Sequence, residues 1–280
     1  MGGPARCGEA AKRCTSRNWT VGPTLKGIMM AEPFWKTALS AVERNKILIR
    51  GYRVQDLMGH CTFGDIIYLT FKGELPAGNE GRMIEMIVVS STDHSFLAPS
   101  IDATRFVASG GVPLQASVAA GIISLGDHHG GAIEQCAKLL QESVKSGATA
   151  AEIVAGFRAR KQRVPGFGHP WHDRDPRTIM LAEKAREWQI AGAHLTLTES
   201  ISRELKLPAN IDGVISGLIS DMGIEWQYGR AFFIIPRVVG LAAHAVEETT
   251  RERPFRVIDI NEVGYDGPPE RDLPESFKTD

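Results

Sequence analysis

The spacing of hydrophobic residues is helical along most of the chain. Apolar side chains between residues 131 and 147 recur at offsets of three, four and seven, and a glycine stands where such a helix would end. Thr62 and Asp65 have the spacing of a helix-capping pair, ahead of an apolar run that ends at Gly73. We therefore expect helices over both segments.

The most apolar stretch, residues 230–247, also predicts a helix, with a kink at Pro236. Alternating patterns typical of strands are almost absent. The best short strand is the Val-Ile-Asp-Ile segment at residues 257–260, at most a minor hairpin element. The patterning predicts an all-α protein.

Residues 1–30 differ from the rest of the chain. They hold five basic residues against the single acid Glu9 and show little apolar periodicity. Two interpretations stay open: a basic targeting segment, or an over-long start ahead of a true beginning near Met29 or Met30. In both cases we expect a disordered extension outside the fold.

Composition narrows the function classes. The formal net charge is -1, with 43% hydrophobic and 23% charged residues. This balance gives no electrostatic reason to expect nucleic acid or an anionic membrane surface as a partner. No apolar run approaches the roughly 20 residues of a membrane helix.

The cysteines are scattered and have no C-x-x-C spacing, so neither a disulfide framework nor a zinc site is expected. They are Cys7, Cys14, Cys61 and Cys136. A reducing compartment, the cytoplasm, fits this usage. His169 and His172 have an H-x-x-H spacing, but Pro170 between them opposes a regular helix and no third ligand is near, so no metal is expected.

Three loops rich in glycine, histidine and proline interrupt the helices, at residues 126–131, 165–170 and 208–213. They contain His129, His169 and Asp212, residue types that serve as general acid, general base and oxyanion donor. Taken singly, such residues are more often surface or capping groups, and an aspartate ahead of a helix is often its N-cap. The residues alone predict a helical enzyme with histidine and aspartate chemistry.

The order of the motifs is more specific. It comprises Arg50-Gly51-Tyr52, Gly73-Glu74-Leu75-Pro76, Asp93-His94, His129-Gly130-Gly131-Ala132, Gly166-Phe167-Gly168-His169, Asp175-Pro176-Arg177, Asn210-Ile211-Asp212, Arg237-Val238-Val239-Gly240 and Ala243-His244. From about residue 45 to about residue 256, this series resembles the citrate synthase family.

The resemblance implies three catalytic residues. His129 matches the histidine that hydrogen-bonds the thioester oxygen as it becomes an enolate. His169 matches the histidine that exchanges a proton with the oxygen of the four-carbon partner. Asp212 matches the carboxylate that moves the proton on the acetyl methyl carbon.

It also implies binding residues for the two halves of the substrate. Groups that match the oxaloacetate-binding set are His94, Arg177 and Arg237, and Arg256 resembles the arginine that reaches the partner subunit's site. Backbone expected to lie against coenzyme A is that of Val164, Pro165, Gly166, Phe167 and Gly168. No permanently bound cofactor is implied, since the coenzyme A thioester is a substrate.

The family's architecture implies a large helical domain, residues 31–129 and 225–280, with a smaller helical domain inserted at residues 130–224. A homodimer, or a higher oligomer, is expected because the segments 114–125 and 230–247 are too apolar to be exposed together.

Two motifs favour a lyase. Residues 126–132 and 210–213 resemble the citrate-synthase-like module of ATP-citrate lyase and stand-alone citryl-CoA lyases. We therefore expect cleavage of (3S)-citryl-CoA to acetyl-CoA and oxaloacetate by a retro-Claisen reaction. The alternatives are a citrate or 2-methylcitrate synthase, which condenses an acyl-CoA with oxaloacetate, and a catalytically silent assembly subunit.

Overall fold

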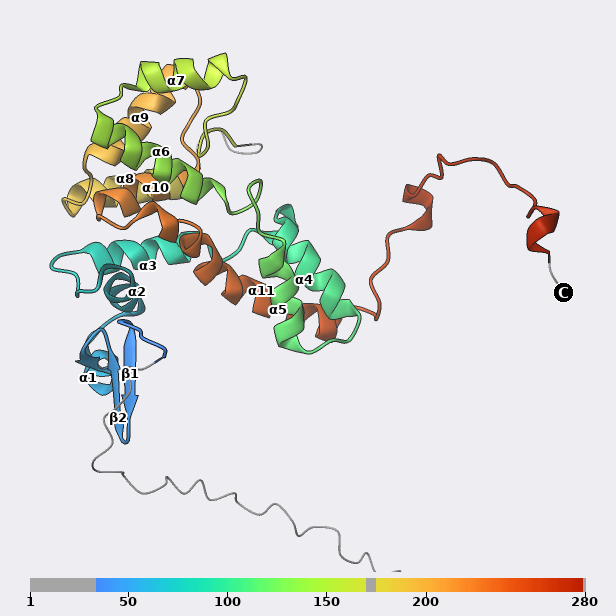
Figure 1. Ribbon diagram of the computed structural model, residues 1–280, viewed down its shortest axis with the longest axis horizontal. Coiled ribbons are helices and arrows are strands. Elements are labelled where there is room, and N and C mark those ends of the chain that lie inside the picture. The colour runs from blue at the N-terminus through green and yellow to red at the C-terminus, as the bar shows by residue number, and fades with distance from the viewer. Residues whose placement is uncertain (1–33, 170–174, 279–280) are drawn as a thin grey trace, which may run out of the picture. The chain divides into compact units, whose positions relative to one another are not determined.

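The computed structural model describes residues 34–169 and 175–278 (Figure 1). The predicted N-terminal extension, residues 1–30, and His172 of the H-x-x-H pair lie outside the described residues. Contacts divide the chain into two units, residues 1–38 and residues 39–280. In the first unit, the rings of Phe34 and Trp35 meet edge to face with centroids 5.1 Å apart.

Helices make up most of the regular structure of the second unit, which confirms the predicted all-α class. Its α-helices are α1 Val54–His60, α2 Phe63–Lys72, α3 Glu80–Ser90, α4 Pro99–Ser109, α5 Leu114–Ile123, α6 Ala132–Ser146, α7 Ala150–Ala159, α8 Pro176–Glu187, α9 Ala193–Leu205, α10 Ile211–Asp221 and α11 Ala231–Arg251. The described residues also form four short 3-10 helices: η1 Ser95–Leu97, η2 Trp226–Tyr228, η3 Ile260–Glu262 and η4 Glu275–Phe277.

The described strands lie elsewhere than predicted. A three-stranded antiparallel sheet joins β1 Ser40–Glu43, β2 Lys46–Ile49 and β3 Tyr52–Arg53. The strand expected at residues 257–260 is wrong, because this segment is irregular up to η3. Val257 and Ile258 are more than 60% exposed, and among the described strands none pairs with them. A short apolar run without a neighbouring strand has no ladder of hydrogen bonds to join.

Local sequence signals set the helix ends as predicted. Thr62 caps α2 in a reciprocal capping box with Asp65, and Gly73 ends the helix in the left-handed conformation at φ 90°. Gly147 ends α6 in the same way at φ 74°. These glycines adopt a conformation that a Cβ atom disfavours.

Helix α10 is the centre of the main hydrophobic core. Nine of its eleven residues are buried, including Ile215, Leu218 and Ile219. It packs against α6, α8 and α9 (Figure 1). A helix enclosed on several sides is a rigid platform, and Asp212 lies in its first turn.

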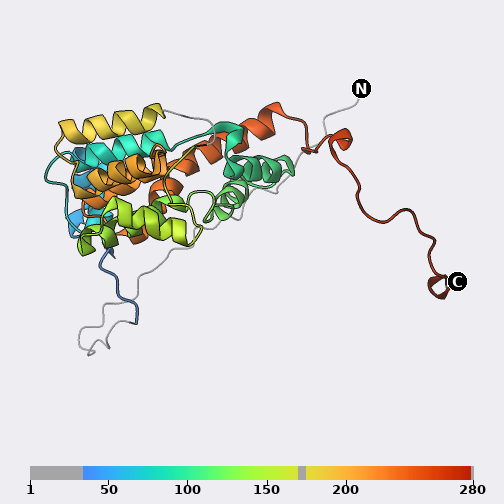
Figure 2. The same cartoon turned by 90° about the horizontal axis from the view of Figure 1, so that it is seen from above.

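Helix α11 is longer than predicted and packs against α4 and α5 (Figures 1 and 2). The segment Trp226–Arg251 is long and apolar enough to cross a membrane, by length and composition only, although no apolar run in the sequence predicted such a span. The helix nevertheless buries Arg237 and Glu248 among its protein contacts. An apolar helix can lie in a membrane or in a protein core. The buried charged residues, which contact other parts of the protein, are typical of a core helix.

Helices α6 to α10 are consecutive in the chain and pack on one another, which is compatible with an inserted domain at residues 130–224. Residues 39–280 nevertheless group as one compact unit. The division into large and small domains therefore stays a prediction.

Candidate active site

Six of the seven side chains predicted to act in catalysis or oxaloacetate binding line one cavity of about 240 Å³. The lining residues are His94, Leu97, Ala98, His128, His129, Gly130, His169, Arg177, Asn210, Ile211, Asp212, Phe233 and Arg237. They come from segments more than 140 residues apart in the sequence. The fold therefore brings together, in one cavity, six side chains that the ordered motifs had predicted to act together.

His129 is held as a neutral imidazole. Its Nε2 accepts a hydrogen bond from the Ser100 backbone N–H, 3.3 Å away in the first turn of α4, and lies 2.9 Å from the Ser100 hydroxyl. A backbone N–H can only donate, so Nε2 carries no proton and the proton is on Nδ1. Burial lowers the pKa of His129 from 6.5 to about 4, and the charges of Arg237 and His94 act in the same direction.

The loop around His129 fixes this ring. Gly126 and His129 exchange two backbone hydrogen bonds of 2.9 and 3.0 Å. Gly130 adopts φ 82°, and a Cβ atom there would lie 2.8 Å from the ring of Phe233. That ring meets His129 edge to face at 5.3 Å. The Nδ1–H donor is thus held in a constrained position, as an oxyanion donor requires.

Asp212 is not the cap of its helix. The side chain of Asn210 caps α10 by accepting a hydrogen bond from the Gly213 N–H, and Asp212 follows two residues later. Its Oδ1 is buried without a hydrogen-bond partner among the described residues. Burial raises the pKa of Asp212 from 3.8 to about 6, against the opposing charges of Arg177 and Arg237. A carboxyl group with this pKa can give or take a proton near neutral pH.

Arg237 is a buried cation with unused donors. The residue is only 2% exposed, and its Nε and Nη1 have no hydrogen-bond partner among the described residues. Its guanidinium lies over the Phe233 ring, 4.6 Å from the centroid. Buried unpaired guanidinium groups are costly, so this arrangement favours an anionic ligand at the cavity.

Arg177 lines the same cavity but has protein partners. Its Nη2 donates to Asp175 at 2.7 Å, and its Nη1 donates to the Ser90 carbonyl at 3.3 Å. Asp175 also caps α8 through the Arg177 N–H. The ring centroids of His94 and His169 lie 6.0 Å apart and nearly perpendicular.

Arg256 is the one predicted side chain of the seven that lies outside the first cavity. It does not line the cavity, and its guanidinium makes two hydrogen bonds of 2.8 and 2.6 Å to Glu248 near the end of α11. Its expected role concerns a partner subunit's site, and it stays a prediction.

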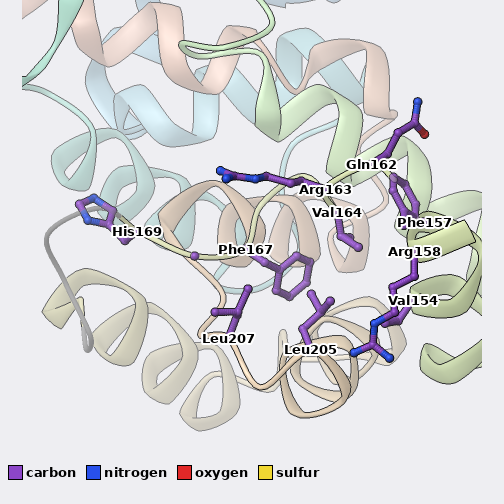
Figure 3. A pocket seen from close by; sticks show the side chains of 11 residues that line it. Val154, Phe157, Arg158, Gln162, Arg163, Val164, Phe167, His169, Leu205 and Leu207 are labelled. Carbon is purple, nitrogen blue, oxygen red and sulfur yellow. The ribbon is translucent and has the colours of Figure 1, made fainter. Parts of the chain in front are cut away.

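A second cavity, of about 680 Å³, shares the lining residue His169 with the first, and Figure 3 shows the side chains that line it. Val164, Phe167 and Gly168 line it, whereas Pro165 and Gly166 do not. His169 lines both cavities, at the opposite end from Val154 and Arg158 in Figure 3. A ligand that extends through the second cavity would therefore present one end to the first.

The loop that carries His169 is attached to the start of α10. Gly168 N–H donates to the Pro208 carbonyl, Asn210 N–H donates to the Gly166 carbonyl, and the Asn210 amide donates to the Gly168 carbonyl, at 2.9, 3.0 and 2.9 Å. Gly166 has φ 87°, and a Cβ atom there would lie 2.8 Å from the Gly213 Cα. Two glycines in contact thus set the spacing between the His169 loop and the Asp212 helix.

Several lining residues had no role in the sequence analysis. Asn210 was part of a quoted motif, and its spacing to Gly213 is a capping signal that identifies it. Arg158, Arg163 and Leu205 line the second cavity and carry no signal beyond ordinary helix and loop composition. Among the described residues, no group of three or more His, Cys, Asp or Glu side chains is placed to hold a metal ion.

Comparison with known proteins identifies the family of this chain. The family model for the citrate synthase C-terminal domain matches residues 78–258. The chain belongs to the citrate synthase family. This confirms the resemblance drawn from the ordered motifs.

Among solved members of the citrate synthase fold, citryl-CoA lyase from Hydrogenobacter thermophilus is 41% identical, with a TM-score of 0.84 over 88% of this chain and 100% of that chain. ATP citrate lyase from Methanothrix soehngenii, solved with citrate and coenzyme A, has a TM-score of 0.78 at 20% identity over 86% of this chain and 43% of that chain. The second likeness shows the fold alone.

A curated relative, the ATP-citrate synthase beta chain protein 1 of Arabidopsis thaliana, is 26% identical over 238 residues. The match takes in 77% of this chain but only 38% of the relative's length. The family, together with the citryl-CoA lyase that is matched over its whole length, supports an enzyme that makes or breaks a carbon–carbon bond.

The contact between the two glycines predicts that Gly213→Ala destabilises the protein. The added methyl group would clash with the Gly166 carbonyl oxygen, which is backbone and cannot rotate away. We expect a loss of about 1–3 kcal/mol in the free energy of unfolding, measured by urea denaturation.

The matched control is Gly156→Ala in α7, where the nearest atom to a new Cβ would be 3.5 Å away at the end of Arg160. It should stabilise the helix by about 0.5–1 kcal/mol. Equal stabilities of Gly213→Ala and the parent protein would show that this contact is not constrained.

The raised pKa of Asp212 predicts that Asp212→Asn increases stability at high pH. The folded protein binds this proton more tightly than the unfolded chain, so the stability it contributes is complete below pH 3.8 and is lost as the pH rises through about 6. Asparagine removes that loss, and we expect a gain on the order of 1–3 kcal/mol at pH 8 and none near pH 3.5.

Thermal melting across this pH range measures the difference. Asp221→Asn is the control, because Asp221 is a buried carboxylate that accepts hydrogen bonds from the N–H groups of Gly192, His194 and Leu195. Its replacement should destabilise the protein. A gain for Asp212→Asn that is the same at both ends of the range would contradict the titration.

Proposed function

We propose that this protein is a citryl-CoA lyase, which cleaves (3S)-citryl-CoA to acetyl-CoA and oxaloacetate without hydrolysing the thioester. The observation that carries the proposal is the meeting of three groups in one cavity. They are the neutral His129 donor, the buried Asp212 acid and the Arg237 cation, whose Nε and Nη1 have no hydrogen-bond partner among the described residues. The 41% identity to a citryl-CoA lyase over that chain's whole length supports this direction over the synthase.

The proposed reaction assigns each proton and electron pair. His169 accepts the proton of the citryl hydroxyl, and that oxygen becomes the carbonyl of oxaloacetate. The carbon–carbon bond breaks, and its electron pair moves into the thioester as an enolate. His129 stabilises the enolate oxygen by a hydrogen bond from its Nδ1–H and keeps that proton. Protonated Asp212 gives its proton to the enolate carbon, which becomes the acetyl methyl group.

Charge and shape support the proposed placement of the substrate. Arg237 would pair with a carboxylate of the four-carbon part, together with His94 and Arg177, since arginine forks suit carboxylates. The coenzyme A part would extend through the second cavity, past Phe167 toward Arg158. No permanent cofactor enters this proposal.

The alternative is a citrate or 2-methylcitrate synthase, in which the same groups run the condensation. Asp212 would then take a proton from the acyl methyl or methylene carbon, and the thioester would be hydrolysed. A catalytically silent assembly subunit is the third reading, which the combination of His129, His169 and Asp212 in one cavity disfavours.

We also propose a homodimer, in the cytoplasm. Leu114, Val118 and Ile122 of α5 and Val238 of α11 line an apolar surface depression of about 590 Å³. Ile123 also lines this depression and is 81% exposed. A second copy of the chain would cover this face, as extended apolar patches favour.

Asp212→Asn is expected to lower kcat for citryl-CoA cleavage by about 10²–10⁴-fold, because asparagine cannot deliver the proton. KM should change little, since the carboxyl faces the reacting carbon and not the coenzyme A tail. The assay follows free thiol and acetyl-CoA separately on synthetic citryl-CoA. Acetyl-CoA without free thiol supports the lyase, and free thiol supports the synthase.

Asp127→Asn is the matched control, because this exposed carboxylate pairs with Arg230 outside the cavity. It should keep its turnover. In the parent protein, cleavage requires protonated Asp212, so kcat/KM should fall as the pH rises above about 6. Near-normal turnover by a folded Asp212→Asn protein would refute the catalytic role of this residue.

The dimer proposal predicts twice the chain mass in light scattering at micromolar concentration. Ile123→Asp should shift the protein toward the monomer, because it would bury an unpaired carboxylate in the interface. Val89→Asp in α3 is the control, since Val89 is 72% exposed and does not line this depression. A parent protein that is monomeric at this concentration would overturn the proposal.

A further inference from the structure

His244 lies on the same face of α11 as Arg237, two helical turns further along. Gly240 lies between them on that face. The segment of Thr92 and Asp93 runs across it: a Cβ atom at Gly240 would clash with the Thr92 carbonyl and would lie 3.1 Å from Asp93 Oδ1. The missing side chain thus allows this segment to contact the helix backbone, immediately before His94.

The hydrogen bonds of His244 fix its tautomer. Arg105 Nη1 lies 3.1 Å from His244 Nδ1, and a guanidinium can only donate, so Nδ1 is the acceptor. The ring proton is therefore on Nε2, which donates to Asp93 Oδ1 at 3.1 Å. His244 therefore links Arg105 to the Asp93 carboxylate through one hydrogen bond on each ring nitrogen.

Arg105 is itself immobilised. It is 3% exposed, and its Nε donates to the buried Glu248 at 2.6 Å. Its Nη1 also donates to Glu247 at 3.1 Å. The donor that faces His244 is therefore anchored between α4 and α11, and it cannot follow a movement of the Asp93 segment.

The turn after Asp93 needs such support. Asp93 Oδ2 accepts the Ser95 N–H at 3.2 Å, and Ser95 has φ 53°, a conformation unfavourable for a residue with a side chain. Phe96 follows, with its ring 6.1 Å from that of His244. His94, in the middle of this turn, is thus bracketed by two contacts to the same histidine.

We propose that His244 is a positioning residue that holds the turn of Asp93 to Phe96 and thereby places His94 in the cavity. That His94 contacts the four-carbon part of the ligand rests on the proposed function. The geometry of the turn is independent of the proposed function. Removing the imidazole breaks the link to Asp93, whereas glutamine offers both a donor and an acceptor at similar reach.

The kinetic test compares His244→Ala with His244→Gln. Product inhibition of citryl-CoA cleavage by oxaloacetate should weaken about tenfold in the alanine variant, a loss of the size of one positioned hydrogen bond. Inhibition by acetyl-CoA, which does not depend on His94, should stay within about twofold. The glutamine variant should recover most of the oxaloacetate affinity.

The matched control is His194→Ala. His194 is a similarly buried histidine whose Nδ1 lies 2.9 Å from Asp221, and it lines neither cavity. It should leave both inhibition constants unchanged. Asp93→Asn should weaken oxaloacetate inhibition as His244→Ala does, and the double variant should be no worse than either, because both act through one contact.

A second measurement does not depend on activity. The imidazole proton NMR signals of His94, assigned by their loss in His94→Asn, should shift in His244→Ala and stay in place in His244→Gln and His194→Ala. If the parent protein does not cleave citryl-CoA, the proposed function fails and the NMR comparison still decides the positioning role. Unshifted His94 signals in a folded His244→Ala protein, or equal effects of alanine and glutamine, would overturn it.

Discussion

The site depends on the contact between two glycine backbones, Gly166 in the loop that carries His169 and Gly213 in the first turn of α10. No side chain fits between them. Because α10 is packed between α6, α8 and α9, the loop of Gly166 contacts a helix whose position is fixed by the core. The distance between an imidazole on one segment and a carboxyl on the other follows from this backbone contact.

Within the part of the chain that the structure describes, the rigid site also contains buried polar groups without hydrogen-bond partners, and these destabilise the folded protein. Asp212 Oδ1 and two nitrogens of Arg237 are buried without partners among the described residues, although burial of such groups opposes folding. The large core around α10 offsets this cost. His129, by contrast, has a partner for one ring nitrogen. Ser100 N–H in the first turn of α4 donates to its Nε2, and Nδ1–H remains for another acceptor.

Much of this was predictable from the sequence, for identifiable reasons. The helix ends at Gly73 and Gly147 were predictable because capping is local. The ordered motifs contain most of the residues that line the first cavity. What no pattern showed was the meeting of Ser100 with His129, or of Arg105 with His244, since each joins residues far apart in the chain. The strand at residues 257–260 was wrong because apolar alternation does not reveal whether a neighbouring strand exists.

Asp212 also couples ligand binding to proton uptake. The charges of Arg177 and Arg237 hold its pKa below the value that burial alone would give. A carboxylate that pairs with Arg237 neutralises one of these charges and adds its own negative potential, so the proton affinity of Asp212 rises as the ligand enters. An anionic ligand thus brings the acid into its protonated form, and by reciprocity a proton on Asp212 strengthens the binding of that anion.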